Sequence, residues 1–418
     1  QRQMCIRDSL HLMDEQEAIT KAQALLNRPG DANVSPLAVY RHAAKADSVQ
    51  QRRPNVVLIM MESMSSKLMK HFGQSETLTP FLDSLYTRSI SFRNFYSAGI
   101  HTNHGLYATL YSFPAMMKRN LMKGSVIPRY SGLPTVLKEN GYYNLFFMTH
   151  EGQYDNMNAF FRTNGYDEVF SQEDYPADKV VNSFGVQDDF LYDYAIPVLN
   201  QRAATGQPFF ATLLSISNHP PYVIPPFFHP KTSEPEMQIV EYADWALRQF
   251  FEEARKQPWF DNTIFVLEGD HGKLVGDAEC ELPESYNHIP LMIYSSRIHP
   301  EEKNTFGGQV DIQPTILGLL NIDYLQNNFG VDLLKEERPC MFYTADNMIV
   351  GRNDTLLYLY NYETQQEFTY HIDNGKLKAV PMDDRFLPLK EYSFSMLQSA
   401  EFLVKHGKTV NSVPFTQQ

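Results

Sequence analysis

The sequence has few cysteines, no long hydrophobic run and no excess of basic residues. Its 418 residues include three cysteines, which is too few for a disulfide framework and gives no zinc spacing. Cys280 and Cys340 could pair, although unpaired thiols are the simpler interpretation. No run reaches the roughly 18 apolar residues that a membrane-spanning helix needs. The net charge of −13 argues against nucleic acid as the main partner, because phosphate binding requires a basic surface.

The composition is that of a folded globular protein, with 43% apolar and 20% charged residues. A chain of this length is expected to form one large α/β domain with an appendage. No signal peptide is visible, and the chain begins with Gln, so we expect it to be a fragment. Residues 1–9 resemble translated sequencing-adaptor read-through and are left out of the fold prediction.

The first 50 residues read as a helical linker that leads into the catalytic domain. Residues 15–26 have helical spacing and good helix formers, and Pro29-Gly30 ends the pattern. A second short helix is predicted over residues 36–46, with Ser35 as its N-cap and Pro36 in its first turn.

The central part of the chain alternates apolar runs with helical patterns. The apolar runs lie at residues 56–61, 143–148, 209–216, 264–267 and 291–294. The helical patterns lie at residues 80–87, 132–140, 184–201, 240–257 and 311–320. Continuous apolar strands that alternate with helices are typical of a mostly parallel sheet covered by helices on both faces. We therefore predict an α/β fold, with the catalytic domain at residues 51–341.

The last part of the chain, residues 342–418, has a different pattern. Short alternating stretches at 355–360, 367–372 and 376–380 are separated by turn signals, which is typical of an antiparallel meander. Residues 388–405 then read as a closing amphipathic helix. These residues are predicted to form a small β-meander and helix subdomain.

Polar side chains follow four of the predicted strands. They are Glu62, His150, His219 and the pair Asp270-His271. In open α/β sheets, ligands bind outside the carboxyl ends of the strands. A random scatter of polar residues would not mark the same end of four strands, so we predict a functional site at this edge.

Asp270, His271 and Glu62 are candidate metal ligands. Carboxylate oxygens and an imidazole nitrogen can hold one cation, and Gly269 and Gly272 ease the backbone around the pair. Alternatively, Asp270 caps a helix and His271 is an ordinary loop histidine. The matching position of Glu62 after a second strand favours the metal site.

Thr102 is the candidate nucleophile. It follows a turn and precedes a stretch that can be helical, so its hydroxyl would lie near a helix N-terminus, which favours a phosphate group. Thr102 could also be only a helix cap, the commonest role of threonine there. A metal that lowers the pKa of the hydroxyl would allow Thr102 to be both a cap and a nucleophile. The sequence alone does not distinguish these two roles.

Four histidines are candidate substrate-binding residues. His219, before two prolines, could also protonate a leaving group, or it could be structural. His150, His104 and His288 could line the pocket or be ordinary surface or core histidines. Asp311 is expected at a helix N-terminus.

Six short motifs occur in the order seen in one known family. They are NVVLIMMES (55–63), TPFLD (79–83), SNHP (217–220), GDHG (269–272), HIPL (288–291) and DIQPT (311–315). Over residues 52–335 the chain resembles the lipoteichoic acid synthase family of phosphoglycerol transferases, in the sulfatase-like branch of the alkaline phosphatase superfamily. Each motif is weak alone, whereas six in order are a strong signal.

The resemblance implies one divalent metal, Mn²⁺ or Mg²⁺ with Zn²⁺ as a further option, held by Glu62, Thr102, Asp270 and His271. It implies that Thr102 becomes covalently modified by the phospho-head group of a phospholipid and that His219 binds substrate. A glycan or polymer would accept the group. The family's catalytic domains are extracytoplasmic and hang from membrane helices, so such helices are expected upstream of this fragment, at the cell membrane.

The chain departs from the family patterns in two places. The Cys-x-Pro-x-Arg or Ser-x-Pro-x-Arg motif of true sulfatases does not occur near Thr102, which argues against sulfate ester hydrolysis. The Trp and Arg that the synthases place after the position of His150 are missing from residues 151–159, so the head-group pocket is expected to be altered. We predict a metal-dependent transferase. The alternatives are a phosphodiesterase or sulfatase-like hydrolase that uses the same metal and threonine, and a member of the superfamily without catalytic activity.

Overall fold

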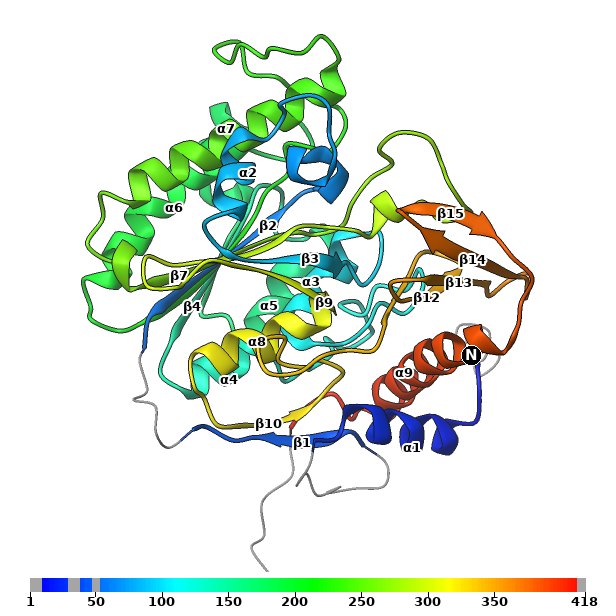
Figure 1. The fold of residues 1–418 in the computed structure, drawn as a ribbon. Helices are drawn as coiled ribbons and strands as arrows, with labels where there is room; N and C mark the ends of the chain where they lie inside the picture. The colour runs from blue at the N-terminus through cyan, green and yellow to red at the C-terminus, as the bar shows by residue number, and fades with distance from the viewer. Residues whose placement is uncertain (1–9, 29–37, 47–52, 412–418) are drawn as a thin grey trace, which may run out of the picture.

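A computed structural model describes residues 10–28, 38–46 and 53–411, with an eight-stranded sheet at the centre of the molecule (Figure 1). In sheet order its strands are β5 (Glu168–Phe170), β4 (Tyr143–Met148), β6 (Phe209–Leu214), β2 (Asn55–Met61), β7 (Thr263–Gly269), β8 (Leu291–Tyr294), β3 (Ile90–Tyr96) and β9 (Glu301–Gly308). All neighbours pair in parallel except that β8 runs antiparallel to both β7 and β3. The prediction of a mostly parallel sheet is confirmed.

Helices cover both faces of this sheet, as strand β2 shows. Alternate side chains of a strand point to opposite faces. Val56, Leu58 and Met60 lie in one core with helices α3, α4, α5 and α8, whereas Val57 and Ile59 lie in the other with α2, α6 and α7. The helices of the first face are α3 (Thr102–Tyr111), α4 (Leu133–Glu139), α5 (Met157–Thr163) and α8 (Ile312–Leu319). Those of the second face are α2 (Pro80–Tyr86), α6 (Asp188–Ala203) and α7 (Pro235–Ala254).

A separate antiparallel sheet and a long helix follow the main sheet. The strands are β11 (Met341–Thr344), β12 (Met348–Arg352), β13 (Leu356–Asn361), β14 (Glu367–Asp373) and β15 (Lys376–Ala379), and they pair in chain order. Helix α9 (Leu387–Lys405) packs against β11 and β12. The boundary assigned at residue 342 falls within β11, one residue after this strand begins.

The N-terminal segment differs from the predicted helical linker. Helix α1 (Glu15–Leu26) is present with the predicted bounds, and it packs against α9 (Figure 1). The prediction of a second helix is wrong at residues Tyr40–Ala43. These residues form strand β1, which pairs antiparallel with β10 (Tyr324–Asn327). Pairing with a distant strand overrides a local pattern of this kind. Residues 1–9, Ser35 and Pro36 lie outside the described residues.

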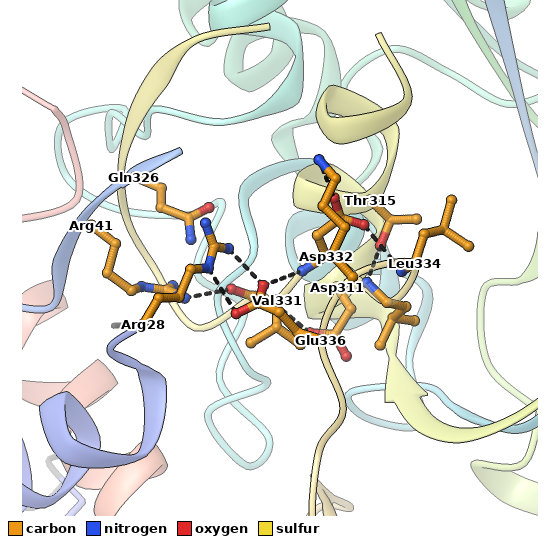
Figure 2. A network of polar contacts seen from close by, with 12 residues as sticks. Arg28, Arg41, Asp311, Thr315, Gln326, Val331, Asp332, Leu334 and Glu336 are labelled. Atoms are coloured by element: carbon orange, nitrogen blue, oxygen red, sulfur yellow. Dashed lines mark hydrogen bonds and ion pairs between the residues drawn. The ribbon is translucent and has the colours of Figure 1, made fainter. Parts of the chain in front are cut away.

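Asp311, at the start of α8, joins this helix to the segment that leads into the C-terminal sheet. Its buried carboxylate accepts hydrogen bonds from the N–H groups of Gly308 and Val331, and it pairs with the Arg338 guanidinium at 2.5 Å. In Figure 2, Val331 and Asp311 lie near the pair of Arg28 and Glu336, which ties the end of α1 to the same segment.

We expect Asp311→Ala to lower the free energy of unfolding by about 3–5 kcal/mol, because it leaves a buried guanidinium without its carboxylate partner. Arg338 is 5% exposed, so water cannot replace the lost carboxylate. The midpoint of urea unfolding measures the change. Asp383→Ala, which removes an exposed ion pair with Arg385, is the control and should have a much smaller effect. Equal midpoints for the two variants would contradict this role of Asp311.

Candidate metal centre and nucleophile

Glu62 and Asp270 are brought together by the register of two central strands. β2 and β7 are parallel neighbours, and Met61 pairs with Gly269 at their carboxyl ends. The N–H of Asp270 also donates to the carbonyl of Met61 at 3.0 Å. The next residue on each strand is therefore the acidic one, and both acidic side chains are buried. The prediction that these strand ends meet at one edge of the sheet is confirmed.

His271 completes a group of three potential metal ligands. Its Nε2 lies 3.8 Å from Glu62 Oε1 and 3.6 Å from Asp270 Oδ2. One ligand atom from each of the three residues lies within 4.8 Å of the other two. This spacing allows all three side chains to bind a single ion.

The hydrogen bonds of the group leave ligand atoms free for a cation. Asp270 Oδ1 accepts from the N–H groups of Ser63 at 2.8 Å and His271 at 2.7 Å, whereas Oδ2 is buried without a hydrogen-bond partner among the described residues. His271 Nδ1 lies 2.7 Å from the carbonyl of Gly272. A carbonyl only accepts, so Nδ1 carries the proton and Nε2 presents a lone pair.

The electrostatics of the buried carboxylates also favour a cation. Burial raises the pKa of Glu62 well above its usual range, and the negative charge of Asp270 raises it further. Two buried carboxylates without a counter-ion are costly. A divalent ion bound between them would offset this cost, so the residues present fit a metal site.

Thr102 lies beside this group. It is the first residue of α3, after His101 as N-cap, and its Oγ1 is 3.4 Å from Glu62 Oε2. The helix can approach the Asp270 backbone closely because Gly105 has no side chain. A Cβ on Gly105 would lie only 2.3 Å from the carbonyl oxygen of Asp270. The hydroxyl therefore lies at a helix N-terminus, where the backbone N–H groups favour an anion. The N-cap is His101, and Thr102 is the first residue of the helix.

His150 and His219 belong to a row of rings. The ring centroids of His150 and Tyr154 are 4.7 Å apart, those of Tyr154 and Phe184 are 6.5 Å apart, and those of Phe184 and His219 are 4.0 Å apart. His150 is buried, whereas His219 is more exposed. His219 and Phe184 line one pocket, and ring contacts through Tyr154 connect them to His150.

His104 and His288 lie in packed surroundings. His104 is fully buried, with Nε2 at 3.2 Å from the carbonyl of Arg119, and burial lowers its pKa to about 3. His288 Nε2 lies 2.8 Å from the carbonyl of Arg93, and its ring stacks on Tyr96. In the described part of the chain, no hydrogen bond or ring contact joins either imidazole to the three ligands. Their predicted role in substrate binding stays a prediction.

Sequence reasoning overlooked Lys273. Lys273 Nζ donates to Asn218 Oδ1 at 2.7 Å and lies over the ring of Tyr222 at 5.3 Å. Asn218 in turn donates to the carbonyl of Ser63. Burial lowers the pKa of Lys273 to about 8, while the nearby charges of Glu236 and Glu62 act in the opposite direction. The only sequence signal was the position of Lys273, two residues after His271.

We expect Lys273→Met to lower kcat roughly 100-fold, since removing one positioned donor from a phosphoryl or acyl oxyanion has an effect of this order. Initial rates on a phosphodiester substrate measure the change. Lys70→Met, which removes an exposed lysine, is the matched control. If both variants kept the rate of the wild type, Lys273 would have no part in the reaction.

A sulfatase family model matches residues 54–322 of the chain. Because this match covers more than half of the chain, the protein belongs to the sulfatase family. Its sequence is also similar to those of lipoteichoic acid synthases.

Curated relatives and solved structures agree with this assignment. The chain is 25% identical to lipoteichoic acid synthase 2 of Bacillus subtilis over 68% of this chain and 47% of the relative. It is 24% identical to the lipoteichoic acid synthase of Staphylococcus saprophyticus over 78% and 53%. The chain thus spans about half the length of these relatives.

Two solved structures show the same fold. An alkaline phosphatase superfamily protein from Vibrio parahaemolyticus superposes with a TM-score of 0.84 at 24% identity, covering 96% of this chain and 98% of the other. The lipoteichoic acid synthase LtaP of Listeria monocytogenes gives 0.74 at 20% identity, covering 96% and 100%. Among the helices of the described residues, none has the length and apolar character needed to cross a membrane.

Proposed function

We propose that the chain is the catalytic domain of a metal-dependent transferase. It moves a phosphoglycerol-type or related phospho-head group from a phospholipid to a glycan or polymer acceptor through a phosphothreonine at Thr102. The observation that carries this proposal is the position of Thr102 Oγ1, 3.4 Å from Glu62 in the group that holds the unpartnered Asp270 oxygen. The sequence similarity to lipoteichoic acid synthases supports this class of reaction.

Glu62, Thr102, Asp270 and His271 would hold one Mn²⁺ or Mg²⁺ ion. When bound, this ion supplies Lewis-acid activation of the threonine hydroxyl and offsets charge on the phosphoryl oxygens. The carbonyl of Gly272 keeps His271 in the tautomer that a ligand needs. The backbone of Ser63 holds Asp270 in place.

In the first half-reaction, Thr102 Oγ1 attacks the phosphorus of the donor. A bond between Oγ1 and phosphorus forms, and the bond from phosphorus to the diacylglycerol oxygen breaks. The hydroxyl proton of Thr102 passes to water, and His219 donates a proton to the leaving diacylglycerol oxygen. The N-terminal N–H groups of α3 and the Lys273 ammonium stabilise the charge on the remaining phosphoryl oxygens. In the second half-reaction, His219 takes the proton of an acceptor hydroxyl, whose oxygen forms a bond to the same phosphorus. The bond between phosphorus and Thr102 Oγ1 breaks, and Oγ1 regains a proton from water.

A phosphodiesterase would use the same residues with water as the acceptor. A phospholipid labelled in its head group, incubated with the protein, Mn²⁺ and candidate glycan or polymer acceptors, separates the two functions. We expect the label to appear on an acceptor. If the label appears only as the free head group with every acceptor present, the protein is a hydrolase.

The donor also bears on where the reaction takes place. A phospholipid head group is presented at a membrane surface, so we propose that the domain works there, on the extracytoplasmic side of the cell membrane. The net charge of −13 offers no general attraction to anionic lipids, so contact with the membrane would depend on specific binding or on a separate anchor.

A further inference from the structure

Exposed apolar side chains gather in the loops at the carboxyl edge of the main sheet. Seven large apolar side chains are exposed among the described residues. Four of them lie in loops that each follow one of four parallel strands: Tyr154 after β4, Val181 after β5, Phe227 after β6 and Leu274 after β7. Loops that follow parallel strands lie at one edge of a sheet, which here is the edge of the candidate metal centre.

Contacts join three of these loops to one another. Val181 lines a small pocket together with Pro221 of the loop after β6. In that same loop, the ring of Tyr222 lies 5.3 Å from Nζ of Lys273, the residue before Leu274. The loops after β5, β6 and β7 therefore adjoin, and we call them together the apolar rim.

The most exposed ring of the apolar rim is held in place by α7. Phe227 is 57% exposed, and its loop lies at the top of Figure 1, just before α7 begins. The ring centroids of Phe227 and Phe228 are each 5.7 Å from that of Trp245 on α7, which is half-buried. The three rings thus form an aromatic group that is open to solvent on one side.

The backbone of this loop is fixed at both ends. Gln187 Nε2 donates to the carbonyl of Val223 at 2.8 Å, and the Glu241 carboxylate accepts from the N–H of Lys231 at 2.8 Å. Residues 219–231 also include five prolines, each of which fixes one backbone angle. The loop therefore keeps Phe227 exposed instead of folding it into the core. Large exposed apolar groups that a protein holds in this way mark interaction surfaces.

The loop also lacks negative charge. Residues 194–233 contain no Asp or Glu, although the whole chain has 49 of them. The exposed part of the loop carries His229 and Lys231, and the next acidic residues, Glu234 and Glu236, come at the junction with α7. Anionic lipid surfaces attract basic residues and repel carboxylates. This loop is therefore compatible with a phospholipid surface, in contrast to the chain as a whole with its net charge of −13.

We propose that the apolar rim docks on the surface of a phospholipid bilayer, with Phe227 inserted among the lipid head groups. Aromatic side chains are enriched at this interface, and burial of the apolar side chains supplies the free energy of binding. Docking through this edge would bring the donor phosphate to the side of the sheet on which Thr102 lies. The inference rests on the proposed function, because it assigns the surface at which the enzyme meets its donor.

Tryptophan fluorescence tests the docking directly. The chain has two tryptophans: Trp245 lies beside Phe227, whereas Trp259 is 4% exposed and precedes β7 at the opposite edge of the sheet. The protein is mixed with EDTA and vesicles of equal parts phosphatidylcholine and phosphatidylglycerol that carry brominated acyl chains. We expect the bromine to quench the emission of the wild type. Trp245→Phe should lose the quenching while it still floats with the vesicles. Absence of quenching in the wild type would overturn the proposal, whether or not the protein floats.

A pair of matched variants locates the contact. Phe227→Ser should weaken vesicle binding roughly tenfold, because it removes the ring that is transferred into the lipid. Leu387→Ser changes a residue that is 48% exposed at the start of α9, outside the apolar rim, and should bind as the wild type does. An unchanged affinity of Phe227→Ser, or an equal loss in both variants, would overturn the role of Phe227. A dimer of the wild type in sedimentation that Phe227→Ser abolishes would also overturn the proposal, since a second copy of the chain would then cover this face.

Turnover with Mn²⁺ separates this inference from the proposed function. Phe227→Ser should release diacylglycerol from the same vesicles without bromine roughly tenfold more slowly than the wild type. It should hydrolyse the soluble ester bis(4-nitrophenyl) phosphate at the wild-type rate. Equal rates of the two proteins on vesicles would overturn the docking and leave the function in place. If the wild type turned over neither substrate, the proposed function would fail, whereas quenching in EDTA would still support the docking.

Discussion

Thr102→Ala is expected to lower the rate of head-group transfer at least about 1,000-fold, because it removes the hydroxyl on which the proposed covalent intermediate forms. Thr102 lies half-buried at the start of α3, and its only side-chain hydrogen bond in the described residues is the long one to Glu62. The fold should therefore persist, as should most of the metal affinity. Initial rates with a phosphodiester substrate and the thermal midpoint measure the two effects.

Two further variants serve as controls for Thr102→Ala. Thr102→Ser keeps a hydroxyl and should retain part of the activity. Thr20→Ala removes an exposed threonine of α1 and should behave as the wild type. Activity of Thr102→Ala within a few fold of the wild type would show that the nucleophile is another group.

Asp270→Ala is expected to abolish metal binding, with an affinity for Mn²⁺ at least about 100-fold lower than that of the wild type. Loss of a supporting group behind a ligand already costs 10–100-fold, and Asp270 provides a buried, charged oxygen with no other partner among the described residues. Activity should fall to background. Titration calorimetry with Mn²⁺ and elemental analysis of the purified protein measure the loss.

The stability of this variant gives an independent measurement. A ligand that binds only the folded state raises the thermal midpoint, so Mn²⁺ should stabilise the wild type and leave Asp270→Ala unchanged. Asp277→Ala, in the exposed part of the same loop, should respond to Mn²⁺ as the wild type does. An equal response in Asp270→Ala would mean that the ion binds elsewhere.

The sequence predicted the part of the site that depends on single strands. The apolar runs of β2 and β7 are long and unbroken, so they read as central parallel strands, and the residues after them fall at the carboxyl edge. The pairing of Met61 with Gly269 then places Glu62 beside Asp270. These residues were predictable because the strand pattern is local and the rule about strand ends is general.

The parts that the sequence did not predict depend on contacts between distant segments. β1 forms because Tyr40–Ala43 pairs with β10, about 280 positions later. Lys273 becomes a functional candidate only because Asn218 comes within 2.7 Å of it. The imidazole of His104 faces a backbone carbonyl, and its residue type alone could not separate this position from a substrate-binding one.

We propose that Thr102 carries the head group between donor and acceptor beside a metal held by Glu62, Asp270 and His271. Mass spectrometry of the protein after brief incubation with donor lipid and Mn²⁺, without acceptor, tests this role of Thr102. We expect the added mass of one phospho-head group on the peptide that contains Thr102, absent without the ion and in Thr102→Ala. Turnover without an adduct, or with an adduct on another residue such as Ser63, would contradict it.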